Sequence, residues 1–393
     1  MDDLYAILET LDKIKLPATL ATIVQVEGSA YKKESACMLI QQDGEQMGVL
    51  SAGCLEQDLI ERVKNGETNK KVTYDMSGED DLSFGAGAGC NGVIHVLMEE
   101  LNDRYLEHLK HLSQLLKSGR SVLLAKQISQ ATYLFVPDRG EPFGTWTTYS
   151  KRELEQIKTK FADQDQKSGT NYLRRNDAVY VHLLKPKPRL IVFGAGTDAI
   201  PLVSMAAGVG FEVYVSDWRS DHCTVARFPK AAQLIHGFPH EAVDSLSIQS
   251  NDFVVIMTHH FTHDQQLLQL LRGRDLRYLG VLGSTRRTAR LVGEEEVPAD
   301  LTSPAGLPIR AQGVDEIAVS IVAQAYPSAS VPCNKKSRGS CCMKIVGVML
   351  AAWIKQSYGA KQIAFTHWPI KHGWICVKRS TSIRFGPCCD HHQ

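Results

Sequence analysis

Long hydrophobic runs are absent from this chain. No apolar stretch approaches the roughly 20 residues that a membrane-spanning helix requires, and residues 1–15 lack the basic and then apolar segments of a secretory signal. We therefore expect a cytoplasmic protein without a membrane partner. Residues 1–15 instead predict an amphipathic helix, because their apolar residues recur on one side: Leu4, Ile7, Leu8, Leu11 and Ile14.

The ten cysteines lack the spacings of common metal centres. No CxxC pair of the zinc-binding kind is present, and no run has the spacing of iron–sulfur ligands. Internal repeats are absent as well. A length of 393 residues predicts two domains.

Strong net charge is also missing, since the formal charge is +1. The charge is unevenly distributed, because residues 331–393 hold ten Lys/Arg, one Asp/Glu and six of the ten cysteines. Basic segments can neutralise phosphates, but these Lys/Arg residues are scattered, so we expect no nucleic-acid partner. The break in composition predicts an atypical, basic, cysteine-rich tail that is poorly ordered.

A Rossmann βαβ pattern is the clearest positive feature. It runs through Arg189–Arg219 as an apolar strand, the glycine turn GAGTDA, a helix-compatible segment and a second strand that ends at Asp217. In this motif Gly194 allows the tight turn, and Gly196 lets the backbone approach a phosphate. Ala199 permits close packing of the helix on the strand. The helix N-terminus then faces an anion.

Asp217 stands where a Rossmann fold places the acceptor for a ribose hydroxyl. The pattern indicates the fold more strongly than the ligand, because a fold does not determine a function. Two alternatives therefore stay open: a nucleotide at the Rossmann site, or a Rossmann domain whose nucleotide site has been reused or lost.

Two glycine-flanked cysteines stand out in residues 1–100. Cys54 follows a turn of small residues and precedes a helical pattern over Leu55–Lys64, so a helix dipole could lower the pKa of its thiol. Cys90 lies in the glycine-rich loop Phe84–Gly92, and glycines are costly to order unless another group approaches the backbone closely. Together they favour sulfur or soft-metal chemistry, with small buried side chains or a disulfide as alternatives.

The rest of this half predicts α/β structure. Strands are expected over Leu20–Val26, Cys37–Gln41 and Gln46–Leu50, with a turn over Glu27–Ser29. Farther along, we expect a helix over residues 102–117 and a hairpin of residues 121–127 with 131–136.

The Lys-Pro-Lys-Pro sequence at residues 185–188 breaks the pattern, and we place the domain boundary there. The expected architecture is α/β: a mixed N-terminal domain with a connecting segment over 1–187, a Rossmann-like parallel-sheet domain over 188–330, and the tail over 331–393.

Two polar groups follow apolar strands of the Rossmann half, at the edge where open α/β sheets bind ligands. The first group is His259, His260, His263 and Asp264. It could bind a metal or form a solvated loop with a helix cap. The second group is Gly283, Ser284, Arg286 and Arg287. A turn that opens a helix with two arginines suits a phosphate, with ordinary surface charge as the alternative.

These motifs resemble the xanthine dehydrogenase accessory factor (XdhC/CoxI) family over residues 20–100 and 188–326. The N-terminal likeness consists of a VEGS segment, a basic pair, a small-residue strand and an SGGC-type turn followed by glutamate: Val26–Ser29, Lys32 and Lys33, Ala36–Ile40, and Ser51–Glu56. The family's GxGxGCGG loop matches Gly85–Gly92. The Rossmann half matches at Phe193–Gly196, Asp217–Arg219, Arg227–Pro229, Met257–His259, Tyr278–Ser284, Gly306–Ile309 and Asp315–Ile321.

The resemblance implies a chaperone that carries the molybdenum cofactor (molybdopterin) as cargo, supports its sulfuration and inserts it into a xanthine dehydrogenase-type apoenzyme. It implies a cysteine desulfurase as a second partner and purine catabolism as the setting, and it leaves a homodimer open. Cys54 or Cys90 would then hold the molybdenum or carry a persulfide. The cofactor's phosphate would meet the glycine turn, with charged and polar partners at Lys32, Lys33, His259, Arg286 and Arg287.

The chain departs from the family pattern at several positions. Tyr31 and Lys32 replace a proline and an arginine, and lysine cannot reproduce the bidentate grip of arginine. Thr197 replaces a histidine after the glycine turn, and Ala52 replaces a glycine before Cys54. Two other functions remain as alternatives: a subunit of xanthine dehydrogenase, and an NAD(P)-dependent oxidoreductase that uses the Rossmann site.

Part of the tail resembles the start of a molybdenum cofactor nucleotidyltransferase. Lys344–Ala352 predicts a strand that leads into a small-residue turn, and Ala360–Gln362 matches a Lys-Gln step. Trp353 stands where the turn glycine belongs and would keep a nucleotide out. Our hypothesis is that the tail is a damaged remnant, or a shifted-frame read-through, of an adjacent cofactor gene.

Overall fold

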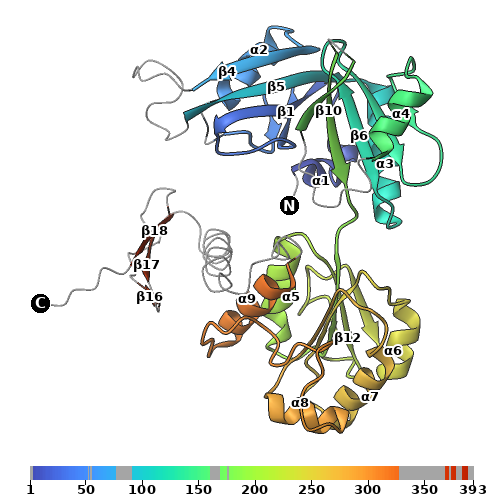
Figure 1. The fold of residues 1–393 in the computed structure, drawn as a ribbon, viewed down its shortest axis with the longest axis vertical. Coiled ribbons are helices and arrows are strands. Elements are labelled where there is room, and N and C mark those ends of the chain that lie inside the picture. The colour runs from blue at the N-terminus through green and yellow to red at the C-terminus, as the bar shows by residue number, and fades with distance from the viewer. Residues whose placement is uncertain are drawn as a thin grey trace, which may run out of the picture. The chain divides into compact units, whose positions relative to one another are not determined.

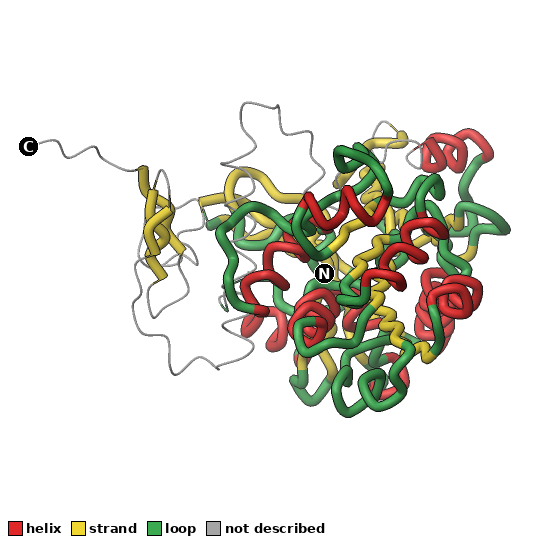
Figure 2. The backbone as a smooth tube through the Cα atoms, turned by 90° about the horizontal axis from the view of Figure 1, so that it is seen from below, coloured by secondary structure: helices red, strands yellow, loops and turns green. Residues whose placement is uncertain are grey.

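The computed structural model describes residues 3–51, 53, 55–76, 91–159, 169–174, 177–326, 368–370, 373–377 and 383–387. The chain divides into two compact units, Met1–Lys187 (unit 1) and Pro188–Gln393 (unit 2). Figure 1 labels the elements of each unit, and Figure 2 shows the backbone by secondary structure. Within the described residues, no helix combines the length and the apolar character needed to span a bilayer.

Unit 1 begins with a five-stranded antiparallel sheet in the order β3-β2-β1-β5-β4. Taken in that order, the strands are Gln46–Met47, Cys37–Gln41, Ala18–Ser29, Asn91–Leu101 and Lys70–Asp75. Alternate residues of β1 face two different cores, as the period of a strand requires. Ile23 packs with helix α2, Glu56–Lys64, whereas Leu20 packs with helices α1, Asp3–Leu8, and α3, Asp103–Lys117.

Three local expectations for this region are wrong. Residues 27–29 do not form a turn, because β1 continues to Ser29 and pairs with β5 as far as Asn91. A Cβ atom on Gly92 would lie 2.3 Å from the carbonyl oxygen of Glu27, so the two strands approach this closely only with glycine there. The third predicted strand is reduced to Gln46–Met47, and helix α1 ends at Leu8, before a 3-10 turn.

The middle of the chain forms a second five-stranded sheet, in the order β8-β7-β6-β10-β9. The predicted hairpin is confirmed by β6, Val122–Gln127, and β7, Thr132–Pro137, and the predicted helix is confirmed by α3. The other strands of this sheet were not predicted, and helix α4 lies between β8 and β9 in the chain. Those elements are β8, Phe143–Gly144; β9, Gly169–Arg174; β10, Asp177–Leu184; and α4, Lys151–Lys158.

A buried ion pair joins the two sheets of unit 1. Lys126 of β6 contacts Glu99 of β5, and the two side chains are only 1% and 2% exposed. Lys126 Nζ also donates a hydrogen bond of 3.0 Å to Thr22 Oγ1 on β1. Burial raises the pKa of the Glu99 carboxyl, and the charge of Lys126 opposes that shift.

Unit 2 contains a five-stranded parallel sheet, and this confirms the predicted Rossmann-like fold class. Its order is β13-β12-β11-β14-β15, and the strands in that order are Gln233–His236, Glu212–Asp217, Arg189–Phe193, Phe253–Ile256 and Tyr278–Val281. The strand order reverses between β11 and β14. The carboxyl ends of these two neighbours therefore frame the place where open α/β sheets bind ligands.

Helices cover both faces of this sheet (Figure 1). Helices α5, Ala199–Gly208, and α9, Val314–Ala325, pack on Leu190 and Val192. On the opposite face, Ile191 packs with three helices: α6, Pro239–Leu246; α7, Phe261–Leu271; and α8, Thr285–Val292. A continuously apolar strand with alternate residues in two cores is typical of a parallel sheet covered on both sides.

The tail contributes a three-stranded antiparallel sheet of β16, Trp368–Ile370; β17, Gly373–Val377; and β18, Ile383–Pro387. The segments of the tail that resemble a nucleotidyltransferase lie outside the described residues. The predicted poor order of the tail and its proposed origin stay predictions.

Candidate functional site

The glycine turn after β11 lies directly against the end of β14. Gly194 has a φ of 118°, which other residues rarely adopt. A Cβ atom at this position would lie 2.4 Å from the carbonyl oxygen of Met257, so a larger residue would separate the two strand ends. The backbone N–H of Gly194 also donates to the carbonyl oxygen of Ser216 on β12, at 2.8 Å. The turn is thereby fixed to both neighbouring strands.

Asp217, the expected ribose acceptor, already accepts four hydrogen bonds. The backbone N–H of Ala195 donates to Oδ2 at 2.7 Å, and Arg219 donates its backbone N–H, Nε and a terminal nitrogen at 2.9–3.0 Å. Burial by itself would raise the pKa of the Asp217 carboxyl, but these hydrogen bonds outweigh it and hold the pKa below its usual value. A ribose hydroxyl could donate to this carboxylate only by displacing Arg219 or the backbone N–H group of Ala195.

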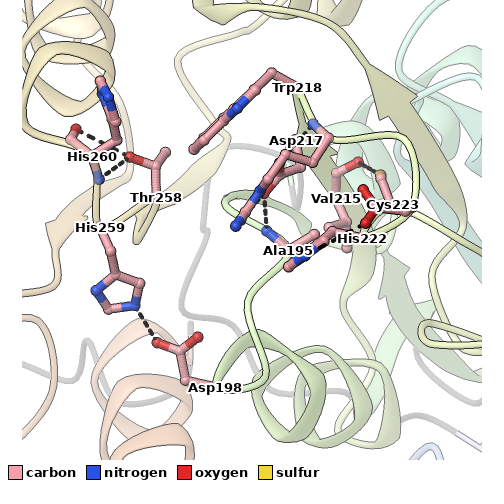
Figure 3. A network of polar contacts seen from close by, with 12 residues as sticks. Ala195, Asp198, Val215, Asp217, Trp218, His222, Cys223, Thr258, His259 and His260 are labelled. Atoms are coloured by element: carbon pink, nitrogen blue, oxygen red, sulfur yellow. Dashed lines mark hydrogen bonds and ion pairs between the residues drawn. The ribbon is translucent and has the colours of Figure 1, made fainter.

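Asp198 and His259 form a pair across the switch point (Figure 3). Asp198 stands just before helix α5, and its Oδ2 lies 2.7 Å from His259 Nε2. His259 follows β14 in a left-handed conformation with a φ of 60°, and its side chain is 60% exposed. The other carboxylate oxygen of Asp198, Oδ1, lies over Gly196. If Gly196 carried a Cβ atom, that atom would be 2.4 Å from Oδ1. The sequence pattern had singled out His259 but not Asp198.

The turn after β15 is organised by a buried carboxylate. Arg287 donates a hydrogen bond of 2.6 Å to Asp264, whose side chain is 1% exposed, and Thr258 donates to the same carboxylate at 2.5 Å. Ser284 caps helix α8 by accepting the backbone N–H of Arg287 at 3.3 Å, and Gly283 has a φ of 140°. Arg286 is exposed and has no ion pair with the described residues.

Histidines and aromatic rings gather between β12 and α7, within unit 2. The ring of Trp218 meets His263 edge-on at 4.3 Å and His260 at 5.9 Å, and Phe238 also contacts His263. Burial, followed by the neighbouring His260, lowers the pKa of His263. His260 caps helix α7. Among the described residues, no three histidine, cysteine or acidic side chains are grouped to hold a metal. His260 and His263 lie with their rings 4.2 Å apart.

The two predicted lysines of unit 1 are engaged locally. Lys32 Nζ contacts both carboxylate oxygens of Asp3 on α1, at 3.0 and 3.1 Å. Lys33 is exposed, with its Nζ 3.4 Å from the carbonyl oxygen of Gly28. An anion that used Lys32 would have to compete with Asp3.

Cys54 and Cys90 lie outside the described residues, but the described residues that flank position 54 are joined by hydrogen bonds. Glu56, 5% exposed, accepts the backbone N–H groups of Leu50 and Ser51 at 2.9 and 2.7 Å. The Ser51 hydroxyl donates to Glu56 and accepts the N–H groups of Gly53 and Leu55, both at 3.1 Å. Although burial opposes it, this set of hydrogen bonds holds the pKa of Glu56 below its usual value.

Two further cysteines whose side chains the structure describes are Cys37 and Cys223, and the sequence pattern did not propose either as a site residue. Cys223 donates weakly to the carbonyl oxygens of Val215 and Ile235, both at 3.7 Å. Burial, with the nearby Asp217 charge, raises the pKa of its thiol. A thiol in this environment stays protonated and is a poor nucleophile.

Three family models match consecutive parts of the chain. The XdhC and CoxI family model matches residues 15–75, the BH1974-like central domain matches 103–185, and the XdhC Rossmann domain matches 190–325. The connecting segment predicted from the sequence therefore corresponds to a domain type of its own.

Relatives match over most of their length. The chain is 40% identical over 327 residues to a protein of Bacillus subtilis named as a probable subunit of xanthine dehydrogenase, covering 82% of this chain and 97% of that one. It is 22% identical over 318 residues to the molybdenum cofactor insertion chaperone PaoD of Escherichia coli, covering 78% and 82%. A crystal structure described as a xanthine dehydrogenase from Bacillus halodurans aligns with a TM-score of 0.72 and 42% identity, over 84% of this chain and 98% of that one.

Proposed function

The chain belongs to the XdhC and CoxI family, and from that premise we propose that it is an accessory protein which binds the molybdenum cofactor and inserts it into a xanthine dehydrogenase-type apoenzyme. The observation that carries the proposal is the similarity to the insertion chaperone PaoD, which extends over about four-fifths of both chains. In this proposal the cofactor is cargo, a cysteine desulfurase supplies the sulfur for its sulfuration, and the protein acts in the cytoplasm within purine catabolism.

The charges at the carboxyl edge of the unit 2 sheet support binding of a phosphate-bearing ligand. Arg286 is exposed next to the first N–H groups of helix α8, and Arg287 is held in place by Asp264. An arginine beside a helix N-terminus gives an anion both charge and hydrogen-bond donors. We assign the phosphate of the cofactor to this turn, Gly283–Arg287.

The hydrogen bonds of the described residues that flank position 54 support a role for Cys54. Glu56 accepts the N–H groups of Leu50 and Ser51, and the Ser51 hydroxyl accepts those of Gly53 and Leu55. A thiolate just before helix α2 would be suited to ligate molybdenum or to carry a persulfide. We extend the same proposal to Cys90.

An NAD(P)-dependent oxidoreductase is disfavoured by the state of Asp217. Its carboxylate would have to hold the ribose of a nicotinamide dinucleotide, yet all four of its hydrogen bonds come from the protein itself. The sequence motif alone could not reveal this occupation, because it depends on the side-chain conformation of Arg219.

The proposal can be tested by analysing what the full chain carries when it is purified from cells grown with molybdate. We expect molybdenum by mass spectrometry and a fluorescent pterin after oxidation, and activation of a xanthine dehydrogenase-type apoenzyme by the loaded protein. Cys54→Ala or Cys90→Ala should lose most of the molybdenum and of the activation. Cys223→Ala is the matched control and should retain both, because its protonated thiol is tied to backbone carbonyl groups. Absence of molybdenum and pterin from the native protein would refute the proposal.

A further inference from the structure

A Rossmann fold holds a dinucleotide at two positions, one for the phosphates and one for a ribose. In this protein both positions are occupied by its own side chains. The phosphate place lies over Gly196, where the lack of a side chain lets a phosphate approach the backbone. Here Oδ1 of Asp198 covers that glycine, 2.4 Å from its missing Cβ position. A phosphate at this point would meet a carboxylate, and like charges repel most strongly where water is partly excluded.

The ribose place is closed by a separate set of contacts. Asp217 is 2% exposed, and its carboxylate accepts hydrogen bonds from Ala195 and Arg219. Two independent observations, at the ends of two different strands, therefore indicate that this edge of the sheet does not bind a dinucleotide in the usual Rossmann manner.

What the switch point offers instead is a hydrogen-bond acceptor, Asp198. Asp198 uses Oδ2 to contact His259, but a carboxylate oxygen can accept two hydrogen bonds, so both oxygens keep capacity. Figure 3 shows this pair opposite Trp218 and Asp217, at the carboxyl edge of the sheet. The side chain of Asp198 is 17% exposed and that of His259 is 60% exposed, so the pair can be reached from solvent.

We propose that Asp198, positioned by His259, recognises the donor edge of a 2-amino-4-oxopyrimidine ring, and that the ring is the pterin of the cofactor. This inference rests on the proposed function. Such a ring presents an amino group and a ring N–H side by side, and a carboxylate accepts two parallel N–H groups bidentately. Guanine carries the same edge, whereas adenine and nicotinamide do not. Asp198 thus determines specificity, and the phosphate is left to the turn at Gly283–Arg287.

Direct binding measurements on the purified full chain test the inference. The probes are 6-hydroxymethylpterin, guanosine and NAD⁺, each titrated by calorimetry. We expect the native protein to bind the pterin and not NAD⁺, and Asp198→Asn to weaken pterin binding at least 10-fold. His259→Gln should weaken it less, because it removes only the group that orients Asp198. Asp221→Asn, with an 81% exposed carboxylate in the loop after β12, is the matched control and should bind the pterin like the native protein.

Three results would overturn the inference: NAD⁺ binding at least as tight as pterin binding, pterin affinity unchanged in both Asp198→Asn and His259→Gln, or Asp198-dependent binding of guanosine without binding of the pterin. Circular dichroism on each variant verifies that it is folded. Because Asp198 and His259 follow different strands, the test still stands if one of the two variants misfolds. Molybdenum in the native protein together with an unchanged pterin affinity in the variants would refute this inference alone. An absence of molybdenum and pterin would instead refute the proposed function.

Discussion

Buried carboxylates have different roles in the two units. In unit 1, Glu99 and Lys126 are both almost completely buried, and their ion pair links two sheets. In unit 2, Asp217 and Asp264 are equally buried, but their partners Arg219 and Arg287 are 35% and 26% exposed at the carboxyl edge of the sheet. The pair in unit 1 is buried on both sides and links two sheets, whereas each carboxylate in unit 2 holds a partly exposed arginine at the edge where open α/β sheets bind ligands.

The largest expected effect comes from breaking the pair in unit 1. Lys126→Met should lower the free energy of unfolding of unit 1 by about 3–5 kcal/mol, because it leaves the Glu99 charge buried without a partner. Denaturant unfolding followed by hydrogen exchange in β5 and β6 measures this loss. Replacing both residues, by Lys126→Met with Glu99→Leu, should recover most of the stability, since a hydrophobic pair of similar volume is often neutral. A double variant as unstable as the single one would contradict this account.

A smaller effect is expected from the arginines of unit 2. Arg287→Ala should destabilise unit 2 by about 1–3 kcal/mol, because the Asp264 carboxylate then keeps, within the described part of the chain, only the Thr258 hydroxyl as a donor. Arg286→Ala should change stability by less than about 0.5 kcal/mol, since the side chain is exposed. Hydrogen exchange in β14 and α7 distinguishes the two variants. Equal effects would mean that the Asp264 pair does not support the turn.

The smallest effect concerns pH. Because the pKa of Asp217 is held below its ordinary value of 3.8, its pairing stabilises unit 2 above that pH and the contribution is lost as pH falls through the lowered pKa. Arg219→Ala should therefore cost about 0.5–1 kcal/mol at neutral pH, a modest figure because the arginine is partly exposed. The difference from the native protein should shrink below pH 3.8. Exchange rates of β12 amides at several pH values give the measurement, and a difference that grows on acidification would reverse the assignment.

Much of unit 2 could be predicted because its pattern is local. The apolar strand, the glycine turn and the following strand lie within Arg189–Arg219, and the structure confirms a parallel Rossmann-like sheet there. Unit 1 was harder, since its pairings join distant segments. Strand β1 pairs with its neighbour β5, which lies far along the chain. This pairing keeps Glu27–Ser29 in a strand, although the composition of the segment is typical of a turn. Strands β9 and β10 were missed although they complete the second sheet.

The candidate site shows the same division. The positions of Gly194, His259 and the Gly283–Arg287 turn followed from where apolar strands end. The importance of Asp198 did not, because folding alone brings it near His259, which follows β14. Glu56 belongs to a motif of the sequence, but its hydrogen bonds to Leu50 and Ser51 are known only from the structure. Cys54 and Cys90 stay predictions.

The sequence alone determined the family, the fold class and which residue types stand at the ends of the Rossmann strands, because these depend on spacing and composition along the chain. Only the tertiary structure decided which of those groups are still able to bind a ligand. The reason is physical, because a carboxylate can accept only a few hydrogen bonds. Asp217 already accepts its full number from Arg219 and Ala195, whereas Asp198 can still accept more.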